Sequence, residues 1–455
     1  MKKYRLIAAA CLLIILISMV PFVSAESVFR SDVKAALLLE KNSGQVLYEY
    51  DADERNYPAS LTKIMTCLLA LENGNLQDVV TVTPTALQNL DAAGSSAGLL
   101  PGEELTLLEL LYCVMISSAN EACNVVAEYI CGNVPAFVDM MNARAAELGC
   151  TDTHFANPHG LHNEEHYSTA RDLSLIAMEA IKYDIFREIT NTSYYQLAAT
   201  NLHDARDLYT TNQLIVESGT NPFYYSKASG IKTGFTTPAG RCLISTADNG
   251  NLQTLAVVMG AETELNETET EWVQRSFPEC INLFEYGFKN FKIETVLTTL
   301  YPVAEIPVNM AATTETVALA PVEELRSLVP MEFDSSEITL DIHLNAESVD
   351  APVEEGTVLG TITVMMDGEA LGSTSIAAIT SVARSEITHT KVEAGKYLRN
   401  NWWKWVVGVL FAAIVVLIVL IIAFQIRRGA YRKKRIAERR EVLERRRQIH
   451  KLEGE

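Results

Sequence analysis

Paired cysteines of the kind that hold zinc are absent from this sequence. Its eight cysteines include no CxxC pair, and such pairs are the usual sign of a structural zinc site. Once Cys11 is lost with an N-terminal leader, seven remain: Cys67, Cys113, Cys123, Cys131, Cys150, Cys242 and Cys280. The number is odd, and several lie in apolar helical stretches, where cysteine acts as a small hydrophobic residue. We therefore expect no zinc site and no disulfide framework.

Positive charge is scarce in the body of the chain. The 455 residues include 37 Lys and Arg against 57 Asp and Glu, a formal net charge of -20. Fifteen of the basic residues lie within residues 1–5 and 427–455, so the stretch between them is strongly acidic. Nucleic acid attracts basic surfaces, and we therefore expect no nucleic-acid partner. An acidic surface of this kind keeps a secreted domain soluble.

The N-terminus has the pattern of a secretory signal peptide over residues 1–25. Lys2, Lys3 and Arg5 form a charged start, and an apolar run follows over residues 6–20. Small residues then predict cleavage after Ala25. The alternative is an uncleaved signal anchor, because the apolar run is close to the minimum length for crossing a membrane.

A second apolar segment near the C-terminus predicts a transmembrane helix over residues 402–426. Residues 406–424 carry no charge. As a helix, this run is long enough to cross a hydrocarbon core of roughly 30 Å. Three tryptophans precede this run, at the level where amphipathic rings meet the lipid–water interface: Trp402, Trp403 and Trp405. The alternative is a buried core helix, but such asymmetric flanks have no role in a core.

The basic tail over residues 427–455 predicts the orientation in the membrane. It contains twelve Lys and Arg residues against five Asp and Glu residues. Cytoplasmic flanks carry an excess of Lys and Arg, so we expect a cytoplasmic C-terminus, an extracellular body and a stalk over residues 386–401. The tail either contacts anionic lipid headgroups or is a solvated helix that only determines the topology.

The order of elements predicts an α+β domain over residues 26–292. Strands are expected at both ends of the region, at residues 33–40, 45–50, 241–247 and 252–260. Helices are expected between them and at the end, at residues 60–72, 105–116, 121–130, 134–148 and 272–288. This order predicts an antiparallel sheet with an inserted helical lobe. Residues 293–385 are rich in Val, Ile and Thr and predict a small all-β domain. We find no internal repeat.

The first chemical motif is Ser60-Leu61-Thr62-Lys63 at a predicted helix start. A serine and a lysine three residues apart share one helix face. The positive end of the helix dipole favours an alkoxide on Ser60, and a buried lysine of lowered pKa can take its proton. The alternative is a helix N-cap with a solvated lysine. Ser229 and Lys232 repeat the spacing, but they lie on a predicted strand.

The second and third motifs are Ser118-Ala119-Asn120 and Lys232-Thr233-Gly234. Ser118 can relay a proton, and the Asn120 amide can bind both a carbonyl and an N–H of a substrate. An ordinary helix cap is the alternative for this segment. On an edge strand, Lys232-Thr233 offers a cation and a hydroxyl to a carboxylate, and a glycine lets a peptide backbone approach. The alternative is a strand end with a solvated lysine.

Together, the three motifs form the set of the penicillin-recognising serine enzymes. The sequence resembles the low-molecular-mass D-Ala-D-Ala carboxypeptidases of peptidase family S11 over roughly residues 30–265. The matching segments are residues 58–66, 157–161, 166–170, 232–236 and 239–243, with a weaker match at 351–356. The resemblance implies a serine β-lactamase/penicillin-binding transpeptidase-like fold, followed by the all-β domain. The family commonly ends in an amphipathic helix on the membrane, whereas a spanning helix is predicted here.

The resemblance also implies a role for each motif residue. Ser60 would attack the D-Ala-D-Ala carbonyl of a peptidoglycan stem peptide, with Lys63 as general base. Ser118 and Lys232 would help the proton reach the leaving D-alanine, and Asn120 would orient the substrate amide.

The strand motif would bind the other end of the same substrate. Thr233 would bind the terminal carboxylate, and Gly234 would leave room for the peptide. The backbone N–H groups of Ser60 and Phe235 would form the oxyanion hole. A β-lactam would acylate Ser60 by the same attack and leave slowly.

Two other functions share some of these features. A class A β-lactamase has all three motifs, but it carries a deacylating Glu in an ExxLN segment, and no such segment accompanies Glu164 and Glu165. An inactive scaffold would recruit partners at the membrane, but every motif residue is present.

A loop with three histidines raises the question of a metal. His159, His162 and His166 follow an H-x2-H-x3-H spacing. Loop packing and hydrogen bonding explain them better, since serine chemistry needs no metal. We expect no metal and no cofactor.

Overall fold

The computed structural model describes residues 33–88, 90–91, 94–265 and 272–452. The predicted signal peptide lies outside these residues. The described chain forms two compact units. The first runs to Thr295 and includes Arg326–Glu337, and the second comprises Val296–Leu325 and the chain from Ile338 onward.

A five-stranded antiparallel sheet is the centre of the first unit. Its strand order is β2-β1-β9-β8-β7, so strands from the two ends of the unit lie side by side. The strands are β1 (Ala35–Glu40), β2 (Val46–Tyr50), β7 (Ala228–Thr236), β8 (Gly240–Asp248) and β9 (Gln253–Ala261). The predicted α+β arrangement, a sheet built from both ends of the domain, is confirmed.

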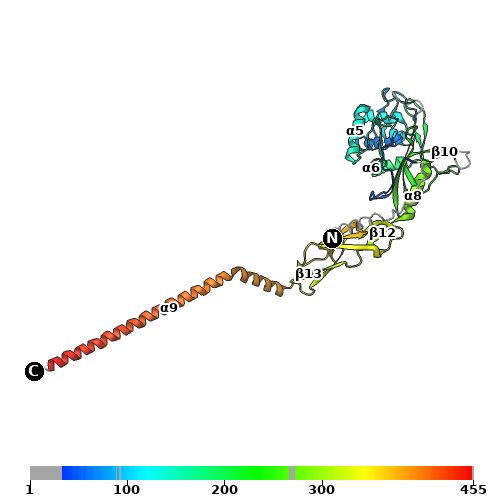
Figure 1. Ribbon diagram of the computed structural model, residues 1–455. Helices are drawn as coiled ribbons and strands as arrows, with labels where there is room; N and C mark the ends of the chain where they lie inside the picture. Colours follow the sequence, from blue (N-terminus) through cyan, green and yellow to red (C-terminus); the bar gives the residue numbers. More distant parts are fainter. Residues whose placement is uncertain (1–32, 89, 92–93, 266–271, 453–455) are drawn as a thin grey trace, which may run out of the picture. The chain divides into compact units, whose positions relative to one another are not determined.

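Strand β1 is buried on both faces because its alternate residues enter two different cores. Leu37 packs in the core shared with the helical lobe, and Leu38 packs in a second core with α8 (Ser276–Asn290). Each is fully buried, which is worth about 1.5–3 kcal/mol per side chain. The sheet therefore lies between α8 and the lobe (Figure 1).

The helical lobe connects β2 to β7. It contains η1 (Ala59–Thr62), a short 3-10 helix, and then α2 (Lys63–Asn73), α3 (Leu107–Met115), α4 (Asn120–Cys131), α5 (Val134–Glu147), α6 (Ala170–Ala180), α7 (Asp184–Thr190) and η2 (Gln213–Ile215). Two small hairpins belong to it, β3 (Val79–Thr81) with β4 (Glu104–Thr106) and β5 (Tyr194–Leu197) with β6 (Arg206–Tyr209). The lobe was predicted as an insertion in the sheet.

Two predicted helix boundaries differ from the structure. Helix α3 begins at Leu107 because Thr106 forms a capping box with Glu109, so the residues before it are free to pair as β4. The last helix was predicted from Trp272, but β11 (Trp272–Gln274) pairs with β10 (Thr263–Leu265) and the helix begins at Ser276. Pairing with a distant strand overrides local propensity here.

The second unit is built on a six-stranded sheet with the order β16-β18-β19-β14-β13-β17. Its strands are β13 (Ala304–Asn309), β14 (Thr316–Pro321), β16 (Ile338–Leu344), β17 (Val349–Asp350), β18 (Val358–Met366) and β19 (Glu369–Ala378). The short 3-10 helix η3 (Ser335–Glu337), which precedes β16 in the chain, belongs to the first unit. The start of the predicted all-β region contains two strands, β12 (Phe291–Leu297) and β13. Strand β12 pairs with β15 (Leu325–Pro330), outside this sheet.

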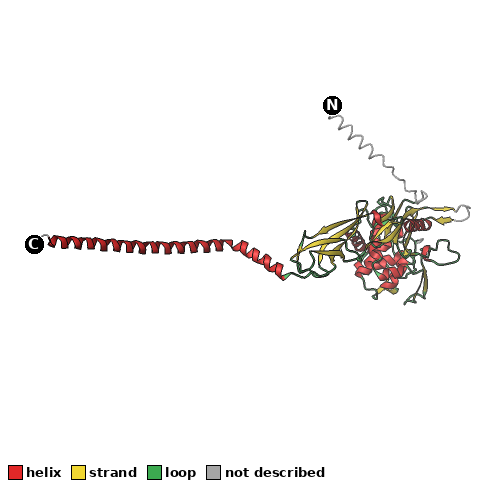
Figure 2. Ribbon diagram, turned by 90° about the horizontal axis from the view of Figure 1, so that it is seen from below, coloured by secondary structure: helices red, strands yellow, loops and turns green. Residues whose placement is uncertain are grey.

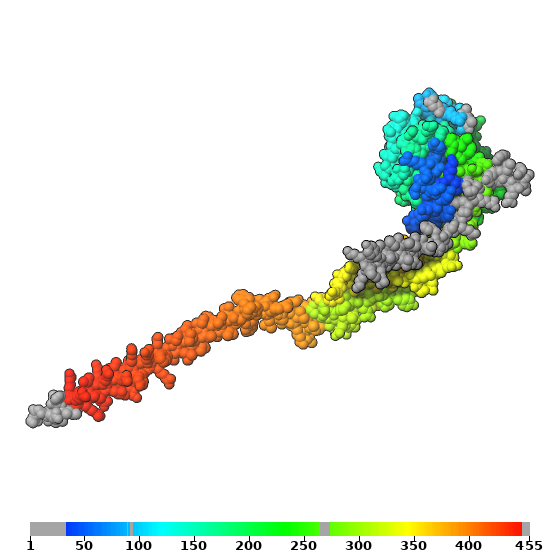
Figure 3. Space-filling model, viewed as in Figure 1, coloured from blue at the N-terminus to red at the C-terminus, as the bar shows by residue number. Residues whose placement is uncertain are grey.

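A single helix, α9 (Glu386–Leu452), ends the chain and contains the predicted stalk, the apolar segment and the tail (Figure 2). Among the described residues it is the one helix long and apolar enough to cross a membrane, judged by length and composition. Its apolar side chains are exposed, as a lipid-facing surface would be, and Figure 3 draws this helix in orange to red. Such a helix is consistent with the predicted C-terminal membrane anchor.

Candidate active site

Ser60 lies on the 3-10 turn η1, one turn ahead of α2, where the helix was predicted to start. The preceding residue, Ala59, has a left-handed backbone with φ 47°. This turn presents the half-buried Ser60 side chain to a pocket. Strain of this kind persists where the surroundings impose it, and it clusters at functional sites.

Two glycines allow other segments to approach this turn. A Cβ atom on Gly160 would lie 1.8 Å from the Ala59 carbonyl oxygen. A Cβ atom on Gly234 would lie 3.1 Å from the Ser60 backbone nitrogen. Gly234 therefore leaves room for the nucleophile turn of the chain itself, in addition to the substrate backbone that we expected it to admit.

Lys63 is fully buried and makes three hydrogen bonds through Nζ. It donates to Ser60 Oγ at 2.9 Å, to Asn120 Oδ1 at 2.8 Å and to the His159 carbonyl at 2.7 Å. Burial lowers its pKa to about 8, while Cys123 and Glu121 oppose the shift. When the amine loses a proton, its lone pair can replace one donated bond and accept the Ser60 hydroxyl proton.

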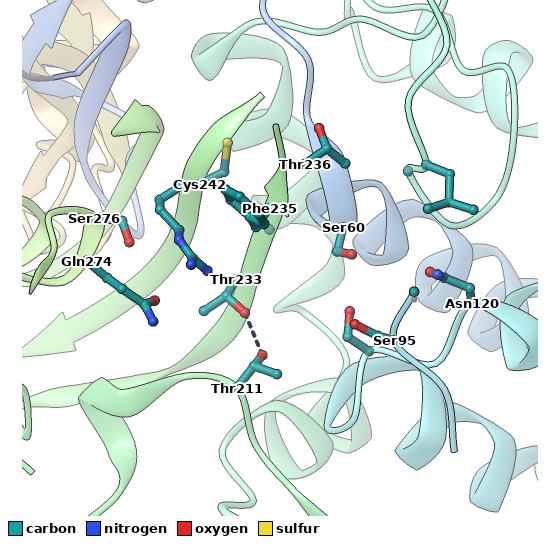
Figure 4. A pocket seen from close by; sticks show the side chains of 16 residues that line it. Ser60, Ser95, Asn120, Thr211, Thr233, Phe235, Thr236, Cys242, Gln274 and Ser276 are labelled. Atoms are coloured by element: carbon teal, nitrogen blue, oxygen red, sulfur yellow. Dashed lines mark hydrogen bonds between the residues drawn. The ribbon is translucent and has the colours of Figure 1, made fainter. Parts of the chain in front are cut away.

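The second motif lies between α3 and α4, as predicted. Ser118 and Asn120 are both buried, and Ser118 has a positive φ of 59°. Asn120 begins α4, and its side chain faces Ser60 across the pocket (Figure 4). Its amide oxygen is engaged by Lys63, so its NH₂ group is left to donate to a substrate carbonyl.

The third motif lies on β7 at the edge of the sheet. Lys232 is buried, and its pKa lies well below the usual value because of burial and the nearby Lys63 cation. Thr233 and Thr211 share a hydrogen bond between their hydroxyls (Figure 4). Ser229 lies on the same strand, which supports the prediction that the second SxxK copy is no nucleophile.

These motifs meet in one pocket of about 440 Å³. It is lined by Ser60, Ser118, Asn120, Thr233, Gly234 and Phe235 among the predicted residues, and by Gly94, Ser95, Gly160, Leu161, Thr211, Thr236, Arg241, Cys242, Gln274 and Ser276 besides. Lys63 and Lys232 lie behind its wall. A nucleophile, a base, an amide and hydroxyls in one polar pocket suit acyl transfer through a serine ester.

Sequence reasoning assigned no role to several of these residues. Thr211 precedes Asn212, whose amide binds the Gly230 carbonyl on β7 and holds this loop at the sheet edge. Arg241 pairs with Phe235 across β7 and β8 and stacks on its ring at 4.0 Å. Thr211 stands in no recognisable motif. Arg241 lies in the family-matched segment at residues 239–243, which marked it as a candidate without indicating its role.

The loop histidines act as hydrogen-bonding residues. His166 Nδ1 accepts the Ala156 N–H at 3.0 Å, so Nε2 carries the proton and donates to Thr62 Oγ1 at 2.8 Å. Burial lowers the pKa of both His159 and His166 to about 3. Within the part of the chain that the structure describes, no three His, Cys, Asp or Glu residues form a metal-binding group.

A Gly160→Ala variant tests the close approach of the loop to the nucleophile turn. Gly149 is a matched control, because it has the same φ of 86° but nothing within 4 Å of an added Cβ. In Gly149→Ala the free energy of unfolding should fall by about 1–2 kcal/mol, which is the cost of holding alanine in a left-handed conformation. In Gly160→Ala the free energy of unfolding, measured in urea, should fall by more than in Gly149→Ala, and the folded protein should be acylated by penicillin more slowly. Equal unfolding free energies and equal acylation rates in the two variants would contradict the close contact.

Comparison with known proteins identifies the family. The D-alanyl-D-alanine carboxypeptidase family, Peptidase_S11, matches residues 23–263, and the penicillin-binding protein 5 C-terminal domain matches residues 294–384. D-alanyl-D-alanine carboxypeptidase DacF of Bacillus subtilis is 33% identical over 350 residues, covering 76% of this chain and 85% of that protein. DacC of Escherichia coli is 30% identical over 390 residues, covering 82% and 87%.

Solved structures agree with this result. Penicillin binding protein 5 from Haemophilus influenzae superposes with a TM-score of 0.59 at 26% identity, covering 78% of this chain and 99% of that chain. PBP3 from Streptococcus pneumoniae, described as a peptidoglycan synthesis regulatory factor, gives 0.61 at 26% identity, covering 78% and 100%.

The fold and pocket define a penicillin-recognising serine enzyme. The chain belongs to the D-alanyl-D-alanine carboxypeptidase family, peptidase family S11. It is a serine-type D-Ala-D-Ala carboxypeptidase of the low-molecular-mass penicillin-binding class and acts on the cell wall, as predicted.

Proposed function

We propose that this enzyme removes the terminal D-alanine from peptidoglycan stem pentapeptides through an acyl-enzyme on Ser60. The observation that carries the proposal is the 2.9 Å contact between Lys63 Nζ and Ser60 Oγ in a buried setting. Burial lowers the pKa of Lys63 to about 8, so a useful fraction of the amine is neutral near neutral pH.

In the acylation step, Ser60 Oγ bonds to the carbonyl carbon of the penultimate D-alanine, and its proton passes to Lys63. The oxyanion binds the backbone N–H groups of Ser60 and Phe235. The close approach of Gly234 to the Ser60 nitrogen supports this pair of donors. Fixed donors of this kind are each worth about 10²–10³ in rate.

In the same step, the C–N bond to the terminal D-alanine breaks and the leaving nitrogen takes up a proton. Ser118 and Lys232 pass this proton from Lys63 to the nitrogen. Asn120 orients the substrate amide through its NH₂ group. Thr233 binds the terminal carboxylate, aided by the neighbouring Thr211 hydroxyl. Water then attacks the ester and releases the shortened peptide and Ser60.

The experiment follows D-alanine release from a diacyl-Lys-D-Ala-D-Ala peptide by the full-length protein in detergent. We expect benzylpenicillin to stop the release and to leave a covalent adduct on the peptide that contains Ser60. Release that is insensitive to penicillin, or an adduct on another serine, would exclude the proposed nucleophile.

We further propose that residues 26–292 form the catalytic domain outside the cell, residues 293–385 a β domain, and residues 427–455 a cytoplasmic tail on anionic lipid. The supporting observation is the basic stretch after the apolar part of α9. Trypsin added to intact protoplasts should digest the catalytic domain and spare the tail. Loss of the tail with a protected catalytic domain would reverse the orientation.

A further inference from the structure

Glu121 is a buried carboxylate beside the active site that the proposed reaction does not use. It follows Asn120 at the start of α4 and is 4% exposed. Its Oε1 accepts hydrogen bonds from Ser96 Oγ at 2.6 Å, Ala97 N at 2.7 Å and Gly98 N at 3.1 Å. These bonds go to a separate segment, so Glu121 does more than cap its own helix.

The segment that Glu121 holds is a wall of the pocket, and Asn120 touches it. Gly94 and Ser95 line the pocket. The Ser95 carbonyl accepts the Asn120 backbone N–H at 2.9 Å. A Cβ atom on Gly94 would lie 2.7 Å from Asn120 Nδ2, and Figure 4 shows Ser95 beside Asn120. A displacement of this wall would therefore move the surroundings of the substrate-orienting amide.

A second anchor holds the same segment from its carbonyl side. Arg206 Nη1 donates to the Ala97 carbonyl at 3.1 Å and to the Gly98 carbonyl at 2.9 Å, while Nη2 pairs with the buried Glu103. Glu121 binds the N–H groups and Arg206 binds the carbonyls of the same two residues. Removing Glu121 leaves the buried Ala97 N–H without its acceptor, whereas the exposed Gly98 N–H keeps Ser96 Oγ at 2.9 Å. An unsatisfied buried N–H is costly, so the segment would shift to find another acceptor for Ala97.

The charge of Glu121 also acts on the general base. Its negative charge raises the pKa of Lys63, against the larger lowering by burial. Glu121 can thus affect the reaction in two ways, by its geometric effect on Asn120 and by its electrostatic effect on the pKa of Lys63. Different substitutions of Glu121 can separate these two effects.

We propose that Glu121 is a positioning residue for the carboxypeptidase reaction, which fixes residues 96–98 and with them the Gly94–Ser95 wall against Asn120. The inference rests on the proposed roles of Ser60, Lys63 and Asn120. All three bonds reach one oxygen, so a glutamine at this position can still accept them through its amide oxygen. An alanine cannot.

The test compares Glu121→Ala, Glu121→Gln and Ser96→Ala in the full-length protein, with Glu147→Gln as the control. The Glu147 side chain lies on α5 and is 68% exposed. The D-alanine release rate is measured per active site, titrated with fluorescent penicillin, over pH 6–10, beside the rate of penicillin acylation and the melting temperature. Titration removes the contribution of unfolded molecules.

Glu121→Ala should lower kcat/KM per titrated site by about 10–100-fold, mostly in kcat, as expected for a catalytic group displaced by about 1 Å. Glu121→Gln should stay within about threefold of wild type at its optimum, with the acid limb of its profile moved to lower pH. Ser96→Ala should lower kcat/KM per titrated site by less than Glu121→Ala does. Glu147→Gln should leave it unchanged.

The proposal is overturned if Glu121→Ala releases D-alanine at the wild-type rate per titrated site. It is also overturned if the alanine and glutamine variants lose the same amount of activity and the pH profile of the glutamine variant does not move. In either case Glu121 is merely structural. A wild-type protein that is acylated by penicillin but releases no D-alanine would refute the proposed substrate instead, and the acylation rates would still decide the role of Glu121.

Discussion

Replacing Ser60 with alanine should abolish D-alanine release and covalent penicillin binding together, with a fall in kcat of at least about 10⁴-fold. Removing the nucleophile of a serine acyl-enzyme leaves only the contribution of binding and the oxyanion hole. The fold should persist, because the hydroxyl is half-buried and its hydrogen bond is to Lys63. The measurement is single-turnover D-alanine release and gel fluorescence with labelled penicillin.

The control for this variant is Ser229→Ala. Ser229 also stands three residues before a lysine, Lys232, but it lies on β7 with an exposed side chain. It should keep wild-type turnover and acylation. If Ser60→Ala still acquires label, or if Ser229→Ala loses it, the nucleophile has been assigned to the wrong copy of the motif.

Lys63→Gln is expected to cause the second large loss, about 10²–10⁴-fold in acylation, which is the usual contribution of a general base. The glutamine amide can still donate to the Asn120 oxygen or the His159 carbonyl, so the buried acceptors keep a partner. It cannot take the Ser60 proton. Stopped-flow acylation by a chromogenic cephalosporin measures this loss.

The pH profile gives the same prediction an independent readout. Lys63 must be neutral to act as a base, and its pKa is lowered to about 8. The wild-type kcat/KM should therefore rise with pH and reach half its limit near pH 8. Lys63→Gln should lack this limb. A wild-type profile that is flat from pH 6 to 9, or a variant that keeps the limb, would exclude Lys63 as the general base.

The sequence by itself was sufficient for the features that depend on local patterns. A strand was predicted over residues 33–40, and β1 forms there with Leu37 and Leu38 in two different cores. The serine–lysine spacing predicted a shared face, and the two side chains are in contact. The uncharged run with its basic flank predicted the anchoring helix, because hydrophobic length is a property of one segment.

Only the tertiary structure decided the contacts between distant segments. The third partner of Lys63 is the carbonyl of His159, 96 residues away, and a carbonyl has no signature in the sequence. Gly160 is required by the Ala59 turn, which the chain brings beside it. Strand β11 replaces the start of a predicted helix because β10 pairs with it.

The same holds for Glu121. In the sequence it is one acidic residue in the first turn of a helix, where negative charge is common. The fold turns it instead towards the Ser96 hydroxyl and the N–H groups of Ala97 and Gly98. Sequence thus determined which chemical groups this enzyme carries and on which elements. The long-range packing of those elements decided which groups meet, because burial and hydrogen bonding depend on neighbours that the chain supplies from elsewhere.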